Sequence, residues 1–436
     1  MNTFAMVNQD VFAPSLDPAR FQDVLTSTPG ALVKEKRQVA FDAYRRLPMP
    51  TVRDEEWRRT DPSLFPFEQF TLLPHLNRIN AAEATELDEL FDVVVTVSET
   101  GWGIHDRKCL LADGKLTVCG LDDASRDFSK KLEPYLHGPA IIEPDRKFTE
   151  LNGAFWNVGL YIHIPANFQL EHGILVRYSL NQSGAMLVPK LVVVAESGSN
   201  ARVVEVFQSE SDNPVFCVGA RELYVAQAAR LQLFALQEWG RNSYHIGEDW
   251  AEVERDAQID WVTLTLGAKV SKMTMGCNVK APNANAYLSG LFFADKDQHV
   301  DQRTLQQHTA PHTYSNLLYK GAVKDEGHSV YQGIIAASQG AIKVDAYQMN
   351  NNLVLNTGAR ADSLPGLKID ADDLKCSHGS TMGNLDPDQL FYLRSRGLSE
   401  AEARKMLVLA FFEEIITKIP YEFLQERIRD DVNRKI

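Results

Sequence analysis

A β-rich run that follows a small residue at a turn recurs at a nearly constant interval through the middle of this chain. The small residues that anchor it are Gly173, Ala201, Ala229, Ala257, Ala284 and Ala341, and their separations are 28, 28, 28, 27 and 57 residues. The last interval is two steps, with the middle step around His312, and one further step reaches Gly366. Runs of period-2 alternation such as LQLFAL and IDWVTLTL lie inside the units.

A period just under 30 residues, with short strands and tight turns, is typical of a β-solenoid, in which each coil buries its inner face by stacking on the coil before it. Propeller blades repeat at ~40–45 residues, and leucine-rich repeats need a Leu/Asn ladder that this chain lacks. We therefore predict a mainly β protein whose core, residues 151–383, is a right-handed parallel β-helix with coils of about 28 residues.

Helical patterns flank this core. Residues 1–90 read as an N-terminal helical region (RQVAFDAYRRLPMP, AAEATELDELFDV), and residues 91–150 as a mixed strand and hairpin segment. Residues 384–436 read as a C-terminal helical domain, in which Ser399 and Glu402 form a capping box. A second helix is expected after Pro420. Because the open strand edges at the ends of a solenoid must be covered, we expect helices to cap both ends.

The net charge and the cysteines indicate which partners and which cellular compartment the chain is suited to. The 436-residue chain has a formal net charge of −13, which disfavours nucleic acid and anionic membrane surfaces as partners. Its start lacks the pattern of a secretory signal, and its apolar runs are shorter than the ~20 residues of a membrane span, so we expect a cytoplasmic protein. Cys109 and Cys119 flank a predicted hairpin with its turn at Asp113–Gly114, one register apart, so they are not expected to form a disulfide.

The sequence lacks the motifs of several common enzyme classes. The phosphate loop, the dinucleotide fingerprint, H-E-x-x-H and G-x-S-x-G are all absent from the sequence. His308 and His312 have the spacing of a helical metal pair, but Pro311 and the surrounding repeat make a structural role the better interpretation. The same holds for His105 with Cys109, and Cys217 and Cys277 read as small buried hydrophobic residues.

The segment Cys376–Ser377–His378 is different, because residues i and i+2 of an extended strand share a face. A thiolate and an imidazole on one face suit iron, zinc or a forming iron–sulfur unit. Two ligands do not complete a tetrahedral site, so the others would come from elsewhere in the chain, from sulfide or from a second protein. A cysteine that is simply buried, with a locally satisfied histidine, is the alternative interpretation.

The stretch ADDLKCSHGSTMGNLDPDQLFYLRSRGLSEAEAR resembles the C-terminal signature of SufD subunits, in the SufB/SufD family of the SUF iron–sulfur cluster assembly machinery. The resemblance extends through HTAPHTYSNLLYKGAVKDEGHSVYQGII and AIKVDAYQMNNNLVLNTGARADSLPGLKI, with weaker echoes in LNGAFWNVGLYIHIPANFQLE and DEEWRRTD. It covers most of the chain and is most specific between residues 300 and 410. B subunits carry a Glu-His-Glu-like stretch where this chain has Cys-Ser-His-Gly, which favours the D branch.

The resemblance implies a non-catalytic scaffold that pairs with a SufB-like subunit through the β-helix and docks a SufC-like ATPase by its C-terminal helices. The expected ATPase interface is the apolar run of the first of these helices, with residues Met406, Leu407, Leu409, Phe411 and Phe412. By the same resemblance, His378 helps to assemble a transient iron–sulfur cluster, or to hold iron, at the interface with SufB, where the B subunit supplies a cysteine. Cys376 matches the motif but has a less defined role. No cofactor is expected to be tightly bound by this chain alone, and a homodimer is the alternative for the isolated chain.

Two other functions compete with this interpretation. One is a purely structural adaptor of the same complex, with inert Cys376 and His378. The other is a polysaccharide-degrading β-helix enzyme, suggested by NTGARADS, DADD and SHGS. Asp372 and Asp373 lie only five or six residues before His378, whereas neighbours on stacked coils differ by about one repeat, which argues against the enzyme.

Overall fold

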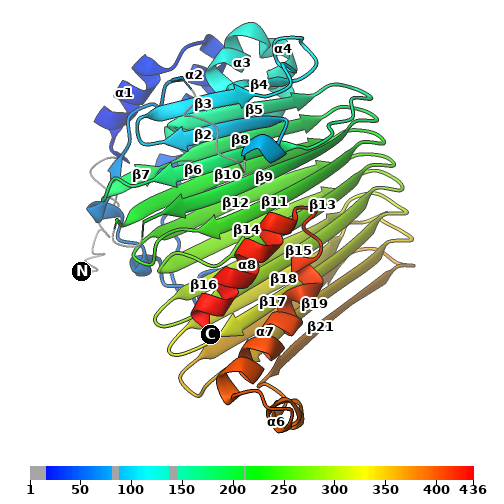
Figure 1. The fold of residues 1–436 in the computed structure, drawn as a ribbon. Coiled ribbons are helices and arrows are strands. Elements are labelled where there is room, and N and C mark those ends of the chain that lie inside the picture. Colours follow the sequence, from blue (N-terminus) through cyan, green and yellow to red (C-terminus); the bar gives the residue numbers. More distant parts are fainter. Residues whose placement is uncertain (1–15, 81–87, 137–145, 211–212) are drawn as a thin grey trace, which may run out of the picture.

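The computed structural model describes residues 16–80, 88–136, 146–210 and 213–436. These residues form a parallel β-solenoid of about 8 turns between N-terminal and C-terminal helices (Figure 1), which confirms the predicted fold class. No helix in the described part of the chain is long and apolar enough to cross a bilayer.

Two sheets form the walls of the solenoid. The strands of sheet A are β1 (Thr71–Leu72), β4 (Thr117–Gly120), β5 (Val158–Ile164), β7 (Ala185–Leu187), β8 (Pro189–Ala195), β10 (Val215–Val225), β12 (Tyr244–Val253), β14 (Val270–Val279), β16 (His299–His308), β18 (His328–Ala337) and β20 (Arg360–Ile369). The strands of sheet B are β2 (Val93–Ser98), β3 (Gly101–Asp106), β6 (Ile174–Leu180), β9 (Asn200–Ser209), β11 (Arg230–Glu238), β13 (Gln258–Thr265), β15 (Asn285–Ala294), β17 (Tyr314–Val323), β19 (Asp345–Val354) and β21 (Lys375–Gly383). From β8 onward the chain alternates between the sheets, so that each strand pairs in parallel with the strand one coil later.

Because neighbouring strands pair in parallel and in register, apolar side chains of successive coils stack on one another inside the solenoid. Leu231 and Leu233 of β11 lie beside Ile259 and Trp261 of β13, and all four are fully buried. Because side chains alternate across a strand, every second residue enters this core and the others face the helices or solvent. The period of the sequence repeat is therefore the length of one coil.

One corner of each coil, between sheet A and sheet B, explains the repeating small residues. A residue with positive φ precedes a buried small residue at Gly198–Ser199, Ala228–Ala229, Asp256–Ala257, Asn283–Ala284, His312–Thr313 and Gly340–Ala341. The anchors at Ala229, Ala257, Ala284 and Ala341 are thus corner residues. Ala201 and Gly366 are not, because Ala201 lies inside β9 and Gly366 lies inside β20.

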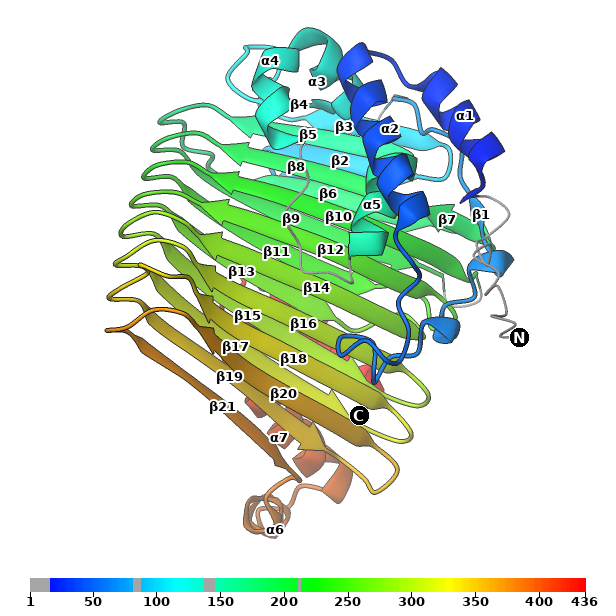
Figure 2. The same ribbon diagram turned by 180° about the vertical axis from the view of Figure 1, so that it is seen from behind.

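The N-terminal helices cover the outer face of sheet A (Figure 2). They are α1 (Pro18–Ser27), α2 (Ala31–Arg46), α3 (Leu121–Asp127), α4 (Ser129–Leu132) and α5 (Arg146–Phe155), with short 3₁₀ turns at Pro62–Leu64, Phe67–Gln69, Asp88–Leu90 and Glu133–Tyr135. Phe21 and Phe41 stack with ring centroids 3.8 Å apart, and both rings meet Phe155 edge-on. Of the helix expected within AAEATELDELFDV, residues 81–87 lie outside the described part of the chain, and Asp88–Leu90 forms a single 3₁₀ turn.

The predicted hairpin at residues 109–119 is wrong. The Asp106 carboxylate accepts the backbone N–H groups of Leu110 and Leu111 at 2.9 and 2.8 Å, which folds this segment into turns. β4 then pairs with β5 in sheet A, whereas β3 pairs with β2 in sheet B. Cys109 and Cys119 are not joined by a disulfide, and the other three cysteines are also free.

The C-terminal helices are α6 (Pro387–Ser395), α7 (Glu400–Ile416) and α8 (Glu422–Lys435), and the capping box of Ser399 and Glu402 is formed as predicted. Figure 1 shows α7 and α8 lying across the outer face of sheet B. There Phe412 belongs to one buried apolar cluster with Phe234, Val262 and Leu291 of that sheet. The expectation that these helices cap the end of the solenoid is therefore wrong, because their apolar face is buried along its side.

Candidate functional site at the open end of the solenoid

The last coil of the solenoid is open. β20 and β21 are the terminal strands of their sheets, and among the described strands none pairs with their far edges. Large apolar side chains on these strands remain exposed, with Leu367 42%, Ile369 36% and Met382 55% accessible. Exposed edges of this kind pair readily with another chain.

Cys376 and His378 lie on β21, in register with Ala346 and Gln348 of β19. Ala346 and Gln348 point into the solenoid and are 2% and 0% exposed. Since neighbouring residues in a parallel register share a face, Cys376 and His378 point the same way, into the open mouth. Cys376 packs partly against the apolar cluster that contains Ala346, whereas His378 is exposed.

The two side chains make an incomplete ligand set. Among the residues that the structure describes, no three His, Cys, Asp or Glu side chains gather closely enough to hold a metal ion. Burial, with a smaller contribution from the nearby Asp345 carboxylate, raises the pKa of the Cys376 thiol, which keeps it protonated at neutral pH. The exposed imidazole of His378 is therefore the more available of the two donors.

The inner face around this pair is polar. The Ser380 hydroxyl donates to the Ser363 hydroxyl at 2.8 Å, and the Ser363 hydroxyl donates to the Asn350 amide oxygen at 2.6 Å. The amide of Gln348, in register with His378, is fully buried and has no hydrogen-bond partner among the residues that the structure describes. We did not predict these residues, although polar residues at alternate positions of YQMNNN are a signal that could have revealed them.

The structure also describes the histidines and cysteines for which the sequence favoured a structural role. His308 is buried, and its two ring nitrogens are 2.7 and 2.8 Å from the hydroxyl oxygens of Thr313 and Ser315. Burial lowers its pKa to about 4, so it is neutral at pH 7. His312 occupies a corner with φ of 56°, and both ring nitrogens of His308 already have hydroxyl partners.

Cys217 and Cys277 are buried in the apolar core, where burial raises their pKa values. Cys109 is exposed in a turn with φ of 54°. In the DADD segment, Asp373 is exposed and its carboxylate lies 2.7 Å from the Lys343 ammonium group.

A second exposed feature is the groove between α6 and α7. It encloses about 490 Å³ and is lined by Asp388, Gln389, Tyr392, Leu393, Met406, Leu407 and Ala410. Tyr392 and Met406 are 56% and 49% exposed. The apolar run predicted as an interface is thus divided. Met406 and Leu407 line the groove. Phe412 is fully buried against sheet B, so it is a core residue and its prediction as an interface residue is wrong. Leu409 and Phe411 are partly buried in the same cluster.

The segment DEEWRRTD fastens an N-terminal loop to the outer face of sheet A. Trp57 is fully buried, and the Lys272 ammonium group lies 4.6 Å from the centre of its ring. The Glu56 carboxylate pairs with Arg303 at 3.1 Å, and the Thr60 hydroxyl donates to the Asp301 carboxylate at 2.5 Å. This segment therefore supports the fold rather than the open end.

Two protein-family models together match almost the whole chain. The model described as the SUF system FeS cluster assembly, SufBD core domain matches residues 178–411, and the model described as the SufBD protein N-terminal region matches residues 19–176.

Curated relatives agree with this result. The chain is 39% identical over 215 residues to an iron–sulfur cluster assembly SufBD family protein of Mycobacterium leprae, covering 48% of this chain and 55% of that protein. It is 27% identical over 451 residues to a protein of the same description from Synechocystis, covering 98% and 96%. A third, from Staphylococcus saprophyticus, is 26% identical over 330 residues and covers 74% and 70%. The chain thus spans about half the length of the mycobacterial relatives that it matches.

Proposed function

This chain belongs to the SufBD family of the SUF iron–sulfur cluster assembly system, and from that premise we propose that it is a non-catalytic scaffold subunit of the D type. In this proposal the open end of the solenoid pairs with a SufB-like subunit, and the nascent cluster or its iron is cargo held between the two chains. The observation that carries the proposal is the pair Cys376 and His378 on the inner face of β21, a terminal strand whose far edge pairs with no described strand.

Three features support a shared rather than a self-contained site. A thiol and an imidazole are suitable ligands for iron, but two donors leave its coordination incomplete. The exposed apolar side chains of β20 and β21 would be buried by a partner that continues the sheets. The Cys-Ser-His-Gly segment favours the D branch over the B branch.

In this role the residues of the chain act by holding and orienting. His378 would offer a ring nitrogen to iron, and the polar serine and asparagine groups around it would keep the mouth wet enough for exchange. Cys376 must lose its proton to ligate a metal, so its contribution should grow as the pH rises.

We further propose that the groove between α6 and α7 docks a SufC-like ATPase. The groove is exposed and apolar, and its helices continue into the segment buried against sheet B. Motion of the docked subunit would therefore reach the solenoid through a packed connection.

The test is the variant His378→Ala, co-expressed with the SufB-like and SufC-like subunits and purified as a complex, with iron and sulfide measured per complex. We expect the complex to form and to lose most of its iron and sulfide. The matched control His172→Ala removes a histidine that is 44% exposed and distant in sequence from the open end, and it should retain its content. Unchanged iron and sulfide in an intact His378→Ala complex would refute the ligand role and leave a purely structural adaptor.

A further inference from the structure

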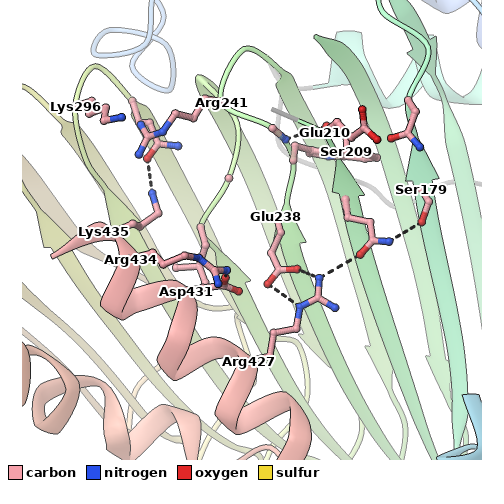
Figure 3. Close-up of a pocket in the computed structure, with 17 residues that line it drawn as sticks. Ser179, Ser209, Glu210, Glu238, Arg241, Lys296, Arg427, Asp431, Arg434 and Lys435 are labelled. Atoms are coloured by element: carbon pink, nitrogen blue, oxygen red, sulfur yellow. Dashed lines mark hydrogen bonds and ion pairs between the residues drawn. The ribbon is translucent and has the colours of Figure 1, made fainter. Parts of the chain in front are cut away.

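A polar pocket of about 720 Å³ lies between α8 and the outer face of sheet B. Figure 3 shows α8 supplying Arg427, Asp431, Arg434 and Lys435 on one side, and the ends of the sheet B strands and the loops after them on the other. The pocket is lined at the ends of β6, β9, β11, β13 and β15, several coils before the open end. It is therefore separate from the proposed cluster site and from the α6–α7 groove.

The charge of the pocket is opposite to that of the chain. Its lining contains the cations Arg241, Lys296, Arg427, Arg434 and Lys435 and the carboxylates Glu210, Glu238 and Asp431. The whole chain carries a formal net charge of −13. A concave surface with an excess of cations on an acidic protein attracts anions and concentrates them locally.

Part of this charge is already paired, which identifies the groups left for a ligand. Arg427 forms an ion pair with Glu238. Arg241 and Lys435 share one carboxylate, that of Asp295, which lies outside the lining. One carboxylate therefore serves two cations, and the side chain of Lys296 forms no ion pair within the described residues.

Two polar atoms at the pocket are buried and have no hydrogen-bond partner among the described residues. They are Nη1 of Arg241 and one carboxylate oxygen of Asp431. Arg434 pairs with the other carboxylate oxygen of Asp431. Unpaired buried polar groups are rare in native proteins and call for an explanation such as a ligand, ion or water.

We propose that this pocket binds a small oxyanion that also carries a hydroxyl group, a class that includes hydroxy-polycarboxylates and sugar phosphates. The anionic oxygens would accept from Arg241 and Lys296, and the hydroxyl would donate to Asp431. A volume of about 720 Å³ is in the range of pockets for small organic ligands.

Binding would also have a mechanical consequence. The proposed donors lie on the loops after β11 and β15, whereas Asp431 lies on α8. A ligand that contacts both sides would cross-link the last helix to the solenoid and hold it in place. The inference thus goes beyond the proposed scaffold function, and it predicts that occupancy stabilises the C-terminal helices.

The experiment is calorimetric titration of the full chain with citrate and with glucose 6-phosphate, with sulfate as a simple oxyanion. We expect saturable binding of one of the two organic anions, at least ten-fold tighter than sulfate, and the stronger arm identifies the source as a carboxylate or a phosphate ester. Because one charge-assisted hydrogen bond is lost, Arg241→Gln should weaken that binding by about ten- to a hundred-fold. Hydrogen exchange should show protection of α8 by the same anion.

Two further variants make the result decisive. Lys296→Gln removes an exposed cation that forms no ion pair with any described residue, so it should fold normally and weaken binding even if Arg241→Gln does not fold. Arg255→Gln, in the exposed turn between β12 and β13, removes the same charge outside the pocket and should leave binding unchanged. Absence of saturable binding for both organic anions, or equal weakening by Arg255→Gln, would overturn the proposal.

Discussion

The two ends of the solenoid differ in how the free edges of their terminal strands are covered. At the first coil, β3 and β4 run antiparallel to their neighbours, and the segment beside β3 covers its edge through hydrogen bonds between Trp102 and the backbones of Asn77 and Ile79 at 3.1 and 2.8 Å. Trp102 itself is 4% exposed and belongs to the core. At the last coil, β20 and β21 keep the parallel direction and leave Met382 55% exposed. At the first end another segment of the chain covers the edge of β3, whereas at the last end no described strand pairs with the far edges of β20 and β21.

The largest effect on stability is expected from a substitution at the closed end. Trp102→Ala should lower the free energy of unfolding by about 3–5 kcal/mol, because a buried aromatic side chain is replaced by a cavity. Met382→Ala at the open end should change it by less than about 0.5 kcal/mol. Urea unfolding of both variants measures the difference, and similar losses at the two ends would contradict it.

The next effect is the pH dependence of stability that the buried His308 in the solenoid interior should cause. Burial lowers the pKa of His308 to about 4, below its value in an unfolded chain of ~6.5. Between these pH values the unfolded state binds more protons, so His308 makes the protein less stable as the pH falls from about 6.5 to about 4. The full loss for this one group is roughly 3 kcal/mol.

Comparing unfolding of the wild type and His308→Asn across this range isolates the contribution. The variant should show a shallower dependence of stability on pH. Identical slopes would mean that the His308 imidazole is not held neutral by burial.

A smaller effect separates the two faces of α7. Met406→Asp should weaken binding of the SufC-like subunit by about ten-fold or more, since a charge would enter an apolar contact, while the unfolding free energy stays within about 0.5 kcal/mol. Phe412→Asp is the contrasting variant and should destabilise the fold, because Phe412 is buried against sheet B. Pull-down and urea unfolding measure both properties. Undiminished ATPase binding by Met406→Asp would count against the groove.

The smallest effect concerns thiol reactivity at the open end. Cys376 should react with iodoacetamide several-fold more slowly than the exposed Cys109 at pH 7, because its pKa is raised and it is half-buried. Its rate should increase with pH as the thiolate forms. Mass spectrometry of the labelled peptides measures both rates, and faster labelling of Cys376 would show that its thiol is already ionised.

The repeat in the sequence was enough to predict the solenoid, because corner residues such as Ala229 and Ala257 recur once per coil. It was not enough to identify every corner, since Ser199 occupies a corner for which Ala201 was the predicted anchor. The capping box at Ser399 is a local signal and was predicted correctly. The position of α7 depends on which apolar face is buried by sheet B, and a helix that is apolar all round does not specify that.

The candidate site shows the same division. Strand alternation predicts that Cys376 and His378 share a face, and the register with Ala346 and Gln348 shows that it is the inner face. The openness of the last coil was not predictable, because it depends on where the C-terminal helices pack. The pocket beside α8 joins residues more than two hundred positions apart in the sequence, such as Ser179 and Lys435, so no local motif could reveal it.

The most direct test of the central claim is hydrogen exchange of this chain alone and in complex with a SufB-like subunit. If the last coil is the surface left for a partner, the amides of β20 and β21 should become strongly protected on complex formation, while those of β2 and β3 at the closed end stay unchanged. A complex that forms without added protection of β20 and β21 would contradict the account.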